Sequence, residues 1–250
     1  MIETRHLFTY ADLQATITIQ QTMWTDPTIL VHPNMLLSIA KNGGAIIGAF
    51  DGDQMVGFVF GFLGATGNPA HTHLKFTSQR MAILPEYRDQ GIGYQLKRAQ
   101  REYALSIGLD HMTWTFDPLF SRNAYFNFHK IGAISRIFAP DYYGAASPLA
   151  RLGTTDRLIV DWHLNQPTRP RIHNPQDLPC VHTAPDIPQS QPFRFEIPYS
   201  YPTDPTWRSV MARLFEGAFS QGYAVVDFYV DEDKHSFYVF APTPVILNQE

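Results

Sequence analysis

Cysteine is almost absent from the sequence, and long hydrophobic or basic runs are missing altogether. The 250 residues include one cysteine, Cys180, so no disulfide can form within the chain, and we expect a reducing cytoplasm as its compartment. The N-terminus shows no apolar stretch of the signal-peptide kind, and no apolar run is long enough to cross a membrane. The formal net charge is −4 and basic residues are scattered, so we expect neither nucleic acid nor a membrane surface as a partner.

The composition is that of a globular protein, and its apolar periodicity predicts an α/β fold. Hydrophobic residues make up 44% of the chain and charged residues 17%, which is enough apolar material for a sizeable core. Helical spacing predicts helices over 10–23, 94–107, 121–131 and 207–221, and runs of β-forming residues predict strands over 45–50, 55–63, 73–84, 111–116, 134–138, 157–164, 223–230 and 236–240. This order favours a mixed, partly parallel central sheet with flanking helices.

The composition changes after Asn165. Ten of the nineteen prolines fall between Pro167 and Pro205, so this stretch is expected to be extended and irregular. Helical and strand patterns then resume. We therefore expect a first domain over 1–165, followed over 166–250 by a proline-rich connection and a C-terminal α+β extension packed on the core.

A glycine-rich turn stands where a predicted strand passes into a helix, in the stretch LPEYRDQGIGYQLK from Leu84 to Lys97. The first backbone N–H groups of a helix have no partner inside the helix and attract anions. Gly91 and Gly93 remove side chains at this point, and Arg88 adds a positive charge, so the stretch is suited to hold a diphosphate. It is not a Walker loop, because no Lys-Ser/Thr pair follows, and the third glycine of a dinucleotide fingerprint is missing.

The run MAILPEYRDQGIG, from Met81 to Gly93, resembles the acyl-CoA-binding motif of the GNAT superfamily of N-acyltransferases. The resemblance covers roughly residues 1–165 and extends to Lys130-Ile131-Gly132-Ala133. Three further runs resemble one branch of that superfamily, some members of which are associated with N-succinylation of amino acids: WTFDPL at 114–119, NAYFN at 123–127 and TDRLIVDW at 155–162.

The resemblance implies a GNAT-type sheet and an acyl-CoA, either acetyl-CoA or another thioester, as co-substrate. It places the pantetheine arm beside the strand end and the diphosphate in the turn. Asn123 is a further candidate for contact with cofactor or substrate, although a surface or capping role is equally open. The residues implied in cofactor binding are Met81, Ala82, Ile83, Arg88, Asp89, Gln90, Gly91, Ile92, Gly93, Tyr94 and Asn123.

The sequence departs from the family where a proton donor is expected. A tyrosine usually stands four residues before the glycine that ends the second helix, and it protonates the leaving thiolate. Counting back from Gly132 gives Phe128, and Ser121 stands where the family usually has asparagine. The candidate acids that remain are Tyr125, Tyr142 and Tyr143, each of which is also compatible with a core or rim position.

A base is also required, because an amine with a pKa near 10 is mostly protonated at neutral pH. Asp117 at a strand end is the first candidate, although Asp-Pro also commonly ends a strand or caps a helix. His73 and Glu86 are alternatives that would act through water. Arg157 is a candidate clamp for a carboxylate, or else a partner in a structural salt bridge.

These residues support one function and leave two alternatives open. The first is transfer of an acetyl or succinyl group from CoA to the primary amine of a small molecule, such as an amino acid. The alternatives are a protein or peptide N-acetyltransferase and a CoA-binding module without catalysis. We expect no metal, because His71 and His73 lack a third ligand nearby in sequence, and we consider a homodimer possible.

Overall fold

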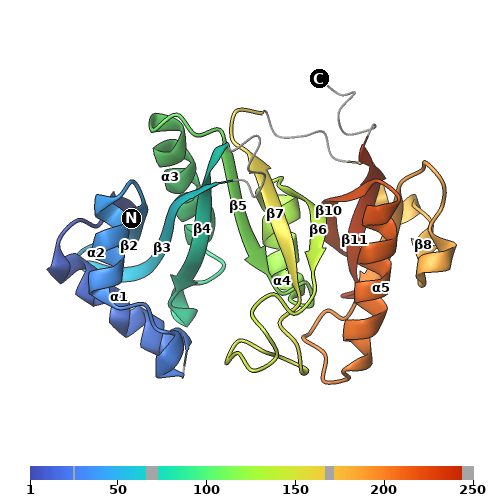
Figure 1. Ribbon diagram of the computed structural model, residues 1–250, viewed down its shortest axis with the longest axis horizontal. Helices are drawn as coiled ribbons and strands as arrows, with labels where there is room; N and C mark the ends of the chain where they lie inside the picture. The colour runs from blue at the N-terminus through green and yellow to red at the C-terminus, as the bar shows by residue number, and fades with distance from the viewer. Residues whose placement is uncertain (25, 66–72, 167–171, 244–250) are drawn as a thin grey trace. The chain divides into compact units, whose positions relative to one another are not determined.

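The computed structural model describes residues 1–24, 26–65, 73–166 and 172–243. His71, one of the two histidines weighed as metal ligands, lies outside them, as do Pro167 and Pro170 of the proline-rich stretch. The helices are α1 Tyr10–Met23, α2 Pro33–Lys41, α3 Ile92–Ser106, α4 Ser121–Ala124 and α5 Thr206–Ser220; the strands are β1 Ile2–His6, β2 Ala45–Asp51, β3 Gln54–Ala65, β4 Leu74–Ile83, β5 His111–Phe116, β6 Ile134–Ala139, β7 Arg157–His163, β8 Cys180–Val181, β9 Phe193–Ile197, β10 Tyr223–Val230 and β11 Ser236–Pro242 (Figure 1).

The chain divides into two compact units. The first contains Met1–Trp114 together with His163–Asn165, and the second contains Thr115–Trp162 together with the chain from Gln166 onward. The chain passes from the first unit to the second within β5 and returns to the first within β7. No helix of the described residues is long and apolar enough to span a membrane.

The sheet of the first unit has the strand order β1-β2-β3-β4-β5. The first four strands are antiparallel neighbours, whereas β4 and β5 run parallel. A tight turn joins β2 and β3, with Asp51 opposite Gln54 and Gly52 at a φ of +57°, a conformation that glycine adopts without strain. The predicted α/β class with a partly parallel sheet is confirmed.

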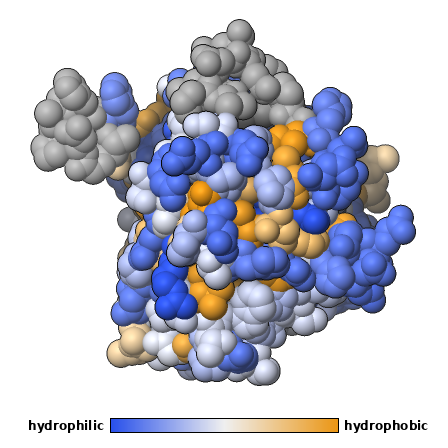
Figure 2. Space-filling view, turned by 90° about the vertical axis from the view of Figure 1, so that its right-hand side faces the viewer, coloured by the Kyte–Doolittle hydropathy of each residue, from blue (hydrophilic) through white to orange (hydrophobic). Residues whose placement is uncertain are grey.

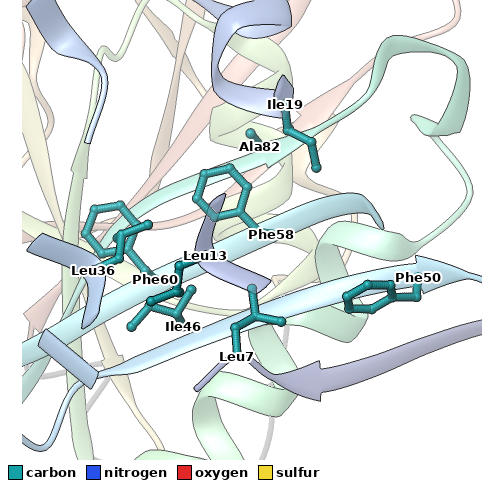
Figure 3. Close-up of a cluster of buried hydrophobic side chains, with 9 residues drawn as sticks. All are labelled: Leu7, Leu13, Ile19, Leu36, Ile46, Phe50, Phe58, Phe60 and Ala82. Atoms are coloured by element: carbon teal, nitrogen blue, oxygen red, sulfur yellow. The ribbon is translucent and has the colours of Figure 1, made fainter. Parts of the chain in front are cut away.

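The core of the first unit lies between this sheet and the helices α1 and α2. Side chains from the helices, such as Leu13, Ile19 and Leu36, meet Phe58 and Phe60 of β3, and all five are at most 2% exposed (Figure 3). Residues two apart on a strand point to the same face, so Phe58 and Phe60 face these helices together. Helix α3 covers the opposite face of the sheet (Figure 1).

Helix α1 begins at Tyr10 because Thr9 and Asp12 form a reciprocal cap. The backbone N–H of Asp12 donates to Thr9 Oγ1 at 3.1 Å, and the N–H of Thr9 donates to Asp12 Oδ2 at 3.4 Å. Two of the unpaired donors at the helix start are thereby satisfied.

The sheet of the second unit has the order β7-β6-β10-β11-β9-β8. Helix α5 packs through Phe215, whose ring centroid lies 5.9 Å from that of Phe138, 5.2 Å from that of Tyr238 and 5.6 Å from that of Phe240. The C-terminal extension is therefore an integral part of this unit. Its outer side, with α5 and β8, shows hydrophobic residues interspersed among polar ones (Figure 2).

One helix and three strands were not anticipated from the sequence: α2, β1, β8 and β9. Of the helix predicted over 121–131, Ser121–Ala124 is α-helical, whereas Tyr125–Lys130 form a π-helical turn. The N–H of Ile131 donates to the carbonyl of Phe126, five residues back, at 3.0 Å. A π-helical turn is rare and is found often at functional sites.

Candidate functional site

Strands β4 and β5 pair only near their beginnings. Phe76 lies opposite Met112 and Thr77 opposite Thr113, and this parallel register ends there although β4 continues to Ile83. On its other edge, β4 remains paired with β3 as far as Ile83. Within the first unit, the later part of β4 therefore has an edge that β5 does not cover, and it contains three predicted cofactor-binding residues: Met81, Ala82 and Ile83.

Helix α3 begins immediately beyond this strand, at a glycine. Gly91 is the N-cap residue, with a φ of +79°, and no side chain caps the helix there. The first hydrogen bond inside the helix runs from the N–H of Gln95 to the carbonyl of Gly91 at 3.1 Å, so the N–H groups of Ile92, Gly93 and Tyr94 precede it. These amides and the helix dipole favour an anion.

The space beside the backbone of Gly91 is open. A Cβ atom placed on Gly91 would meet no atom within 4 Å. The turn that leads into it contains Asp89, which adopts a φ of +62°, and Gln90, whose side chain donates to the carbonyl of Glu86 at 3.0 Å. The α3 N-terminus therefore combines uncapped amides with an unobstructed glycine, and its role in diphosphate binding stays a prediction.

Arg88 is engaged in bracing the turn. Its Nε donates to the carbonyl of Ile83 at 3.3 Å, and a terminal nitrogen lies 2.9 Å from the sulfur of Met23. The side chain is half-buried and ties the turn to the end of β4. Its charge remains close to the helix start, while its hydrogen bonds hold the loop in shape.

Lys97 was not anticipated from the sequence, although it is the most unusual group of this unit. The buried face of the helix consists of Ile92, Leu96, Lys97, Gln100 and Ala104. Lys97 is 3% exposed and Gln100 is fully buried. The signal was available, because positions 97, 100 and 104 follow helical spacing and place both polar side chains on one face.

Asp117 lies in the second unit and is saturated with hydrogen bonds. Arg208 of α5 binds it in a bidentate manner, at 2.8 Å to Oδ1 and 2.6 Å to Oδ2. The hydroxyl of Tyr201 donates to Oδ2 at 2.9 Å and the N–H of Leu119 to Oδ1 at 3.0 Å. Burial, followed by the charge of Asp117, raises the pKa of Tyr201, so this hydroxyl stays protonated and donates. The arrangement is that of a structural ion pair.

The helix after Asp117 contains the other predicted residues of this unit. Asn123 is exposed on α4, and Tyr125 stacks on His129 with ring centroids 4.7 Å apart. Phe128 is 1% exposed and packs between Phe116 and Tyr238, with centroid distances of 5.8 and 6.0 Å. The position of the usual tyrosine is thus a core position here.

Arg157 is a buried cation without a carboxylate in salt-bridge contact among the described residues. It is 7% exposed, and one terminal nitrogen donates to the backbone carbonyl of Asp156 at 2.7 Å. Its guanidinium carbon lies 5.2 Å from the ring centroid of Tyr143, while the hydroxyl of Tyr143 lies 3.4 Å from Thr115 Oγ1. Burial lowers the pKa of Arg157, and the charge of Asp117 opposes this effect.

The remaining candidates are at the surface or lack an activating partner. His73 and Glu86, the alternative bases, and Tyr142, an alternative acid, are all exposed. Burial raises the pKa of Cys180, which makes this thiol less reactive. The absence of a metal stays a prediction; in the first unit the rings of His111 and His163 stack with centroids 5.1 Å apart.

Solved structures share this fold at low sequence identity. The structure of smu.2055 from Streptococcus mutans aligns with a TM-score of 0.52 at 15% identity, over 65% of this chain and 99% of that one. The ribosomal-protein-S18-alanine N-acetyltransferase of Escherichia coli aligns with a TM-score of 0.51 at 16% identity, over 67% of this chain and 96% of that one. Naa20 of Chaetomium thermophilum, in complex with a bisubstrate analogue, aligns with a TM-score of 0.52 at 18% identity, over 64% of this chain and 86% of that one. The predicted GNAT-type fold is confirmed.

The sequence itself carries a family signature. No curated protein matches the chain. Residues 13–132 match the model of the acetyltransferase (GNAT) family, and this range includes the α3 N-terminus and the end of β4. Residues 13–132 therefore carry the signature of the GNAT family of acetyltransferases, whose members take acetyl-CoA as the acyl donor.

Proposed function

We propose that this protein transfers an acetyl or succinyl group from CoA to the primary amine of a small molecule that bears a carboxylate, such as an amino acid. The amine attacks the thioester directly, as in the rest of the family. The N–H groups at the start of α3 hold the diphosphate, and the uncovered edge of β4 at Met81, Ala82 and Ile83 pairs with the pantetheine arm. Where the arm ends, a backbone N–H of the uncovered part of β4 stabilises the oxyanion.

The acceptor class rests on one observation, which is the buried guanidinium of Arg157. A buried charge is costly unless partners compensate it, and the described residues offer Arg157 one backbone carbonyl and the ring of Tyr143 but no ion pair. A guanidinium in such a position is suited to a bidentate bond with a substrate carboxylate. A free amino acid offers a carboxylate to such a guanidinium, whereas the α-carboxyl of a peptide's first residue is an amide, so this observation favours an amino acid.

The other parts of the proposal are expectations drawn from the amino-acid sequence. Residues 1–165 form the acyltransferase domain and 166–250 an extension packed on it, and Asn123 contacts the cofactor or the substrate. The roles of Asp117 as base and Tyr125 as acid stay predictions, although Asp117 is already bound by Arg208, Tyr201 and Leu119. A homodimer and a cytoplasmic location also stay predictions.

A thiol-release assay tests the proposal. The protein is incubated with acetyl-, succinyl- and longer acyl-CoAs against a panel of amino acids, each paired with the matching amine that lacks the carboxylate. We expect release with an amino acid and at least about tenfold lower kcat/KM for its decarboxylated partner, because a charged hydrogen bond contributes about 1.5–3 kcal/mol. Equal rates for both partners would exclude the carboxylate clamp.

A variant separates the clamp from the family reaction. Arg157→Met should raise the KM for the amino acid about 10- to 100-fold, with coenzyme A affinity unchanged by calorimetry. Arg98→Met serves as the control, because Arg98 pairs with Glu102 on the exposed surface of α3 at 3.4 Å. No release with any donor, while coenzyme A still binds, would instead support a binding module without catalysis.

A further inference from the structure

Lys97 places an amine between the two strands that separate. Its Nζ donates to Ser78 Oγ of β4 at 2.8 Å and lies 3.6 Å from the ring centroid of Trp114 on β5. Both contacts lie one residue beyond the last β4–β5 pair, Thr77 and Thr113. No carboxylate of the described residues forms an ion pair with this amine. Within the described residues, the ammonium is therefore buried without a counter-ion of its own.

A second buried polar group lies beside it. Ser78 Oγ, which accepts from Lys97, donates to Gln100 Oε1 at 2.8 Å, so the hydroxyl is fixed in orientation. Gln100 is fully buried, and its Nε2 finds no hydrogen-bond partner among the described residues. A buried amide donor left unused costs free energy, so this place is built for a polar group that arrives with a ligand.

The reaction proposed above needs a proton donor that the family position does not supply. When the acyl group leaves the thioester, sulfur carries away the electron pair of the broken bond. The usual tyrosine hydroxyl is replaced by the phenyl ring of Phe128, which is 1% exposed among other aromatic rings. Another group can supply this proton, and Tyr125 is the candidate from the sequence that Lys97 would replace.

We propose that Lys97 is a further catalytic residue, which donates this proton to the leaving sulfur. The inference rests on the proposed function, because it requires a pantetheine arm along β4. From Ile83 to Ser78 the strand spans roughly 16 Å, at about 3.3 Å per residue. An extended pantetheine arm is of comparable length, so an arm that starts at the α3 N-terminus brings its sulfur to the level of Ser78.

The step is balanced in atoms and charge. The amine nitrogen bonds to the carbonyl carbon, the carbon–sulfur bond breaks, and its electron pair goes to sulfur. Lys97 Nζ gives a proton to that sulfur and becomes neutral. The nitrogen of the new amide loses one proton to water, and Lys97 takes one from water to return to its starting state.

The acidity of Lys97 matches this role. Burial lowers the pKa of Lys97 to about 7, and a free thiol has a pKa of about 8.5. The protonated amine is thus a stronger acid than the thiol that it creates, and near neutral pH a large share of the molecules still carries the proton.

Burial alone lowers the pKa of Lys97, and no neighbouring charge contributes to this shift. The ionisable side chains on the strands packed against α3, and on α3 itself, are Glu3, Arg5 and His6 of β1, Asp51 of β2, Lys75 and Arg80 of β4, His111 of β5, and Tyr94, Arg98, Arg101, Glu102 and Tyr103.

Steady-state kinetics of Lys97→Met test the inference. We expect kcat to fall by about 100-fold or more, with KM and coenzyme A affinity changed less than about threefold. In the wild type, kcat should decline as the pH rises above about 7, since the donor loses its proton, and the variant should show no such decline. Lys41→Met, on the exposed end of α2, is the matched control and should keep wild-type values.

Lys97→Gln guards against a merely structural effect. It retains a donor for Ser78 but has no proton to give, so it should behave as Lys97→Met does. Either variant with kcat within about threefold of the wild type would overturn the inference, and so would a slower variant that keeps the alkaline decline. Both results would leave the proposed function intact, because the wild type still releases thiol. Silence of the wild type with every donor would reject the proposed function and the inference together.

Discussion

At the scale of single residues, burial decides the behaviour of the charged groups. Lys97, Arg157 and Asp117 are all less than a tenth exposed, but their surroundings differ. Asp117 has a complete set of partners, Arg157 has one backbone carbonyl, and Lys97 has a hydroxyl and an aromatic face. The first is thereby suited to stability, and the other two to binding and chemistry.

Lys97 should make the stability of the protein depend on pH. The folded state lowers its pKa to about 7 from the ordinary value of 10.5, so between these values the unfolded chain binds more protons. The free energy of unfolding should therefore rise with pH over this window, by at most about 1.4 kcal/mol per pH unit from this group. Below pH 7 both states are protonated and the slope from Lys97 vanishes.

Chemical denaturation of the wild type and Lys97→Met, at intervals from pH 6 to about pH 10, measures this effect as a difference. The variant should be more stable near neutral pH, because no ammonium is buried, and the gap should close as the pH rises. A gap that does not change with pH would show that Lys97 keeps an ordinary pKa.

Asp117→Asn should destabilise the second unit strongly. The change weakens the bond to Arg208, which is itself nearly fully buried, and an uncompensated buried charge costs about 3–5 kcal/mol. The double change Asp117→Leu with Arg208→Met should cost less than the single one, since no charge remains. Glu102→Gln, in the exposed pair with Arg98, is the control and should cost under about 1 kcal/mol. Urea unfolding gives all three values.

The single variant Asp117→Asn also tests the predicted catalytic role of Asp117. A loss of kcat much greater than the loss of folded protein, in a sample shown to be folded, would support a role as base. An unchanged kcat in the folded fraction would show that the role of Asp117 is structural only.

At the scale of elements, the two ends of α3 form an internal comparison. Gly91 precedes the helix and Gly108 follows it, with φ values of +79° and +81°, and a Cβ atom would meet nothing within 4 Å at either. Alanine should therefore strain both positions equally, by about 1 kcal/mol. Only Gly91→Ala should weaken coenzyme A, by about tenfold or more in calorimetry, because its methyl group enters the space for the diphosphate.

Equal affinities for coenzyme A in Gly91→Ala and Gly108→Ala would contradict the placement of the diphosphate. The comparison also controls for backbone strain, which both variants share.

The long periodic elements could be predicted from the sequence, and the short or tertiary ones could not. Helix α1 and the hairpin of β2 and β3 follow from apolar spacing and a turn glycine. Strand β1 has only Ile2 and His6 even partly buried, so no alternation marks it. The π-helical turn after Ala124 is a matter of hydrogen-bond register, which side-chain spacing does not reveal.

The candidate site divides in the same way. The glycine turn at Gly91 was predicted, because the backbone conformation requires that residue type. The place of Arg88 depends on a contact with Met23, which is 65 residues away. Lys97 was missed because a lysine on a helix is ordinarily exposed, and its burial follows from how α3 lies on the sheet.

At the scale of the whole molecule, the C-terminal extension is expected to be indispensable. It supplies β10, whose Val225 lies opposite Ser135 of β6, and it supplies Arg208 to Asp117. A chain cut after residue 165 should leave a sheet edge and a buried carboxylate without partners, and we expect it to aggregate on expression. A soluble fragment with one cooperative unfolding transition would contradict this.

Arg208 and Asp117 are separated by 91 residues along the chain. During synthesis on the ribosome, at about 5–20 residues per second, Asp117 therefore waits roughly 5–20 seconds for its counter-ion. During that interval the WTFDPL run and its neighbouring strands are exposed, because the C-terminal extension has not yet been synthesised. Slow codons just after Asn165 would lengthen the exposure, and chaperone demand in the cell should track the translation speed of the proline-rich stretch.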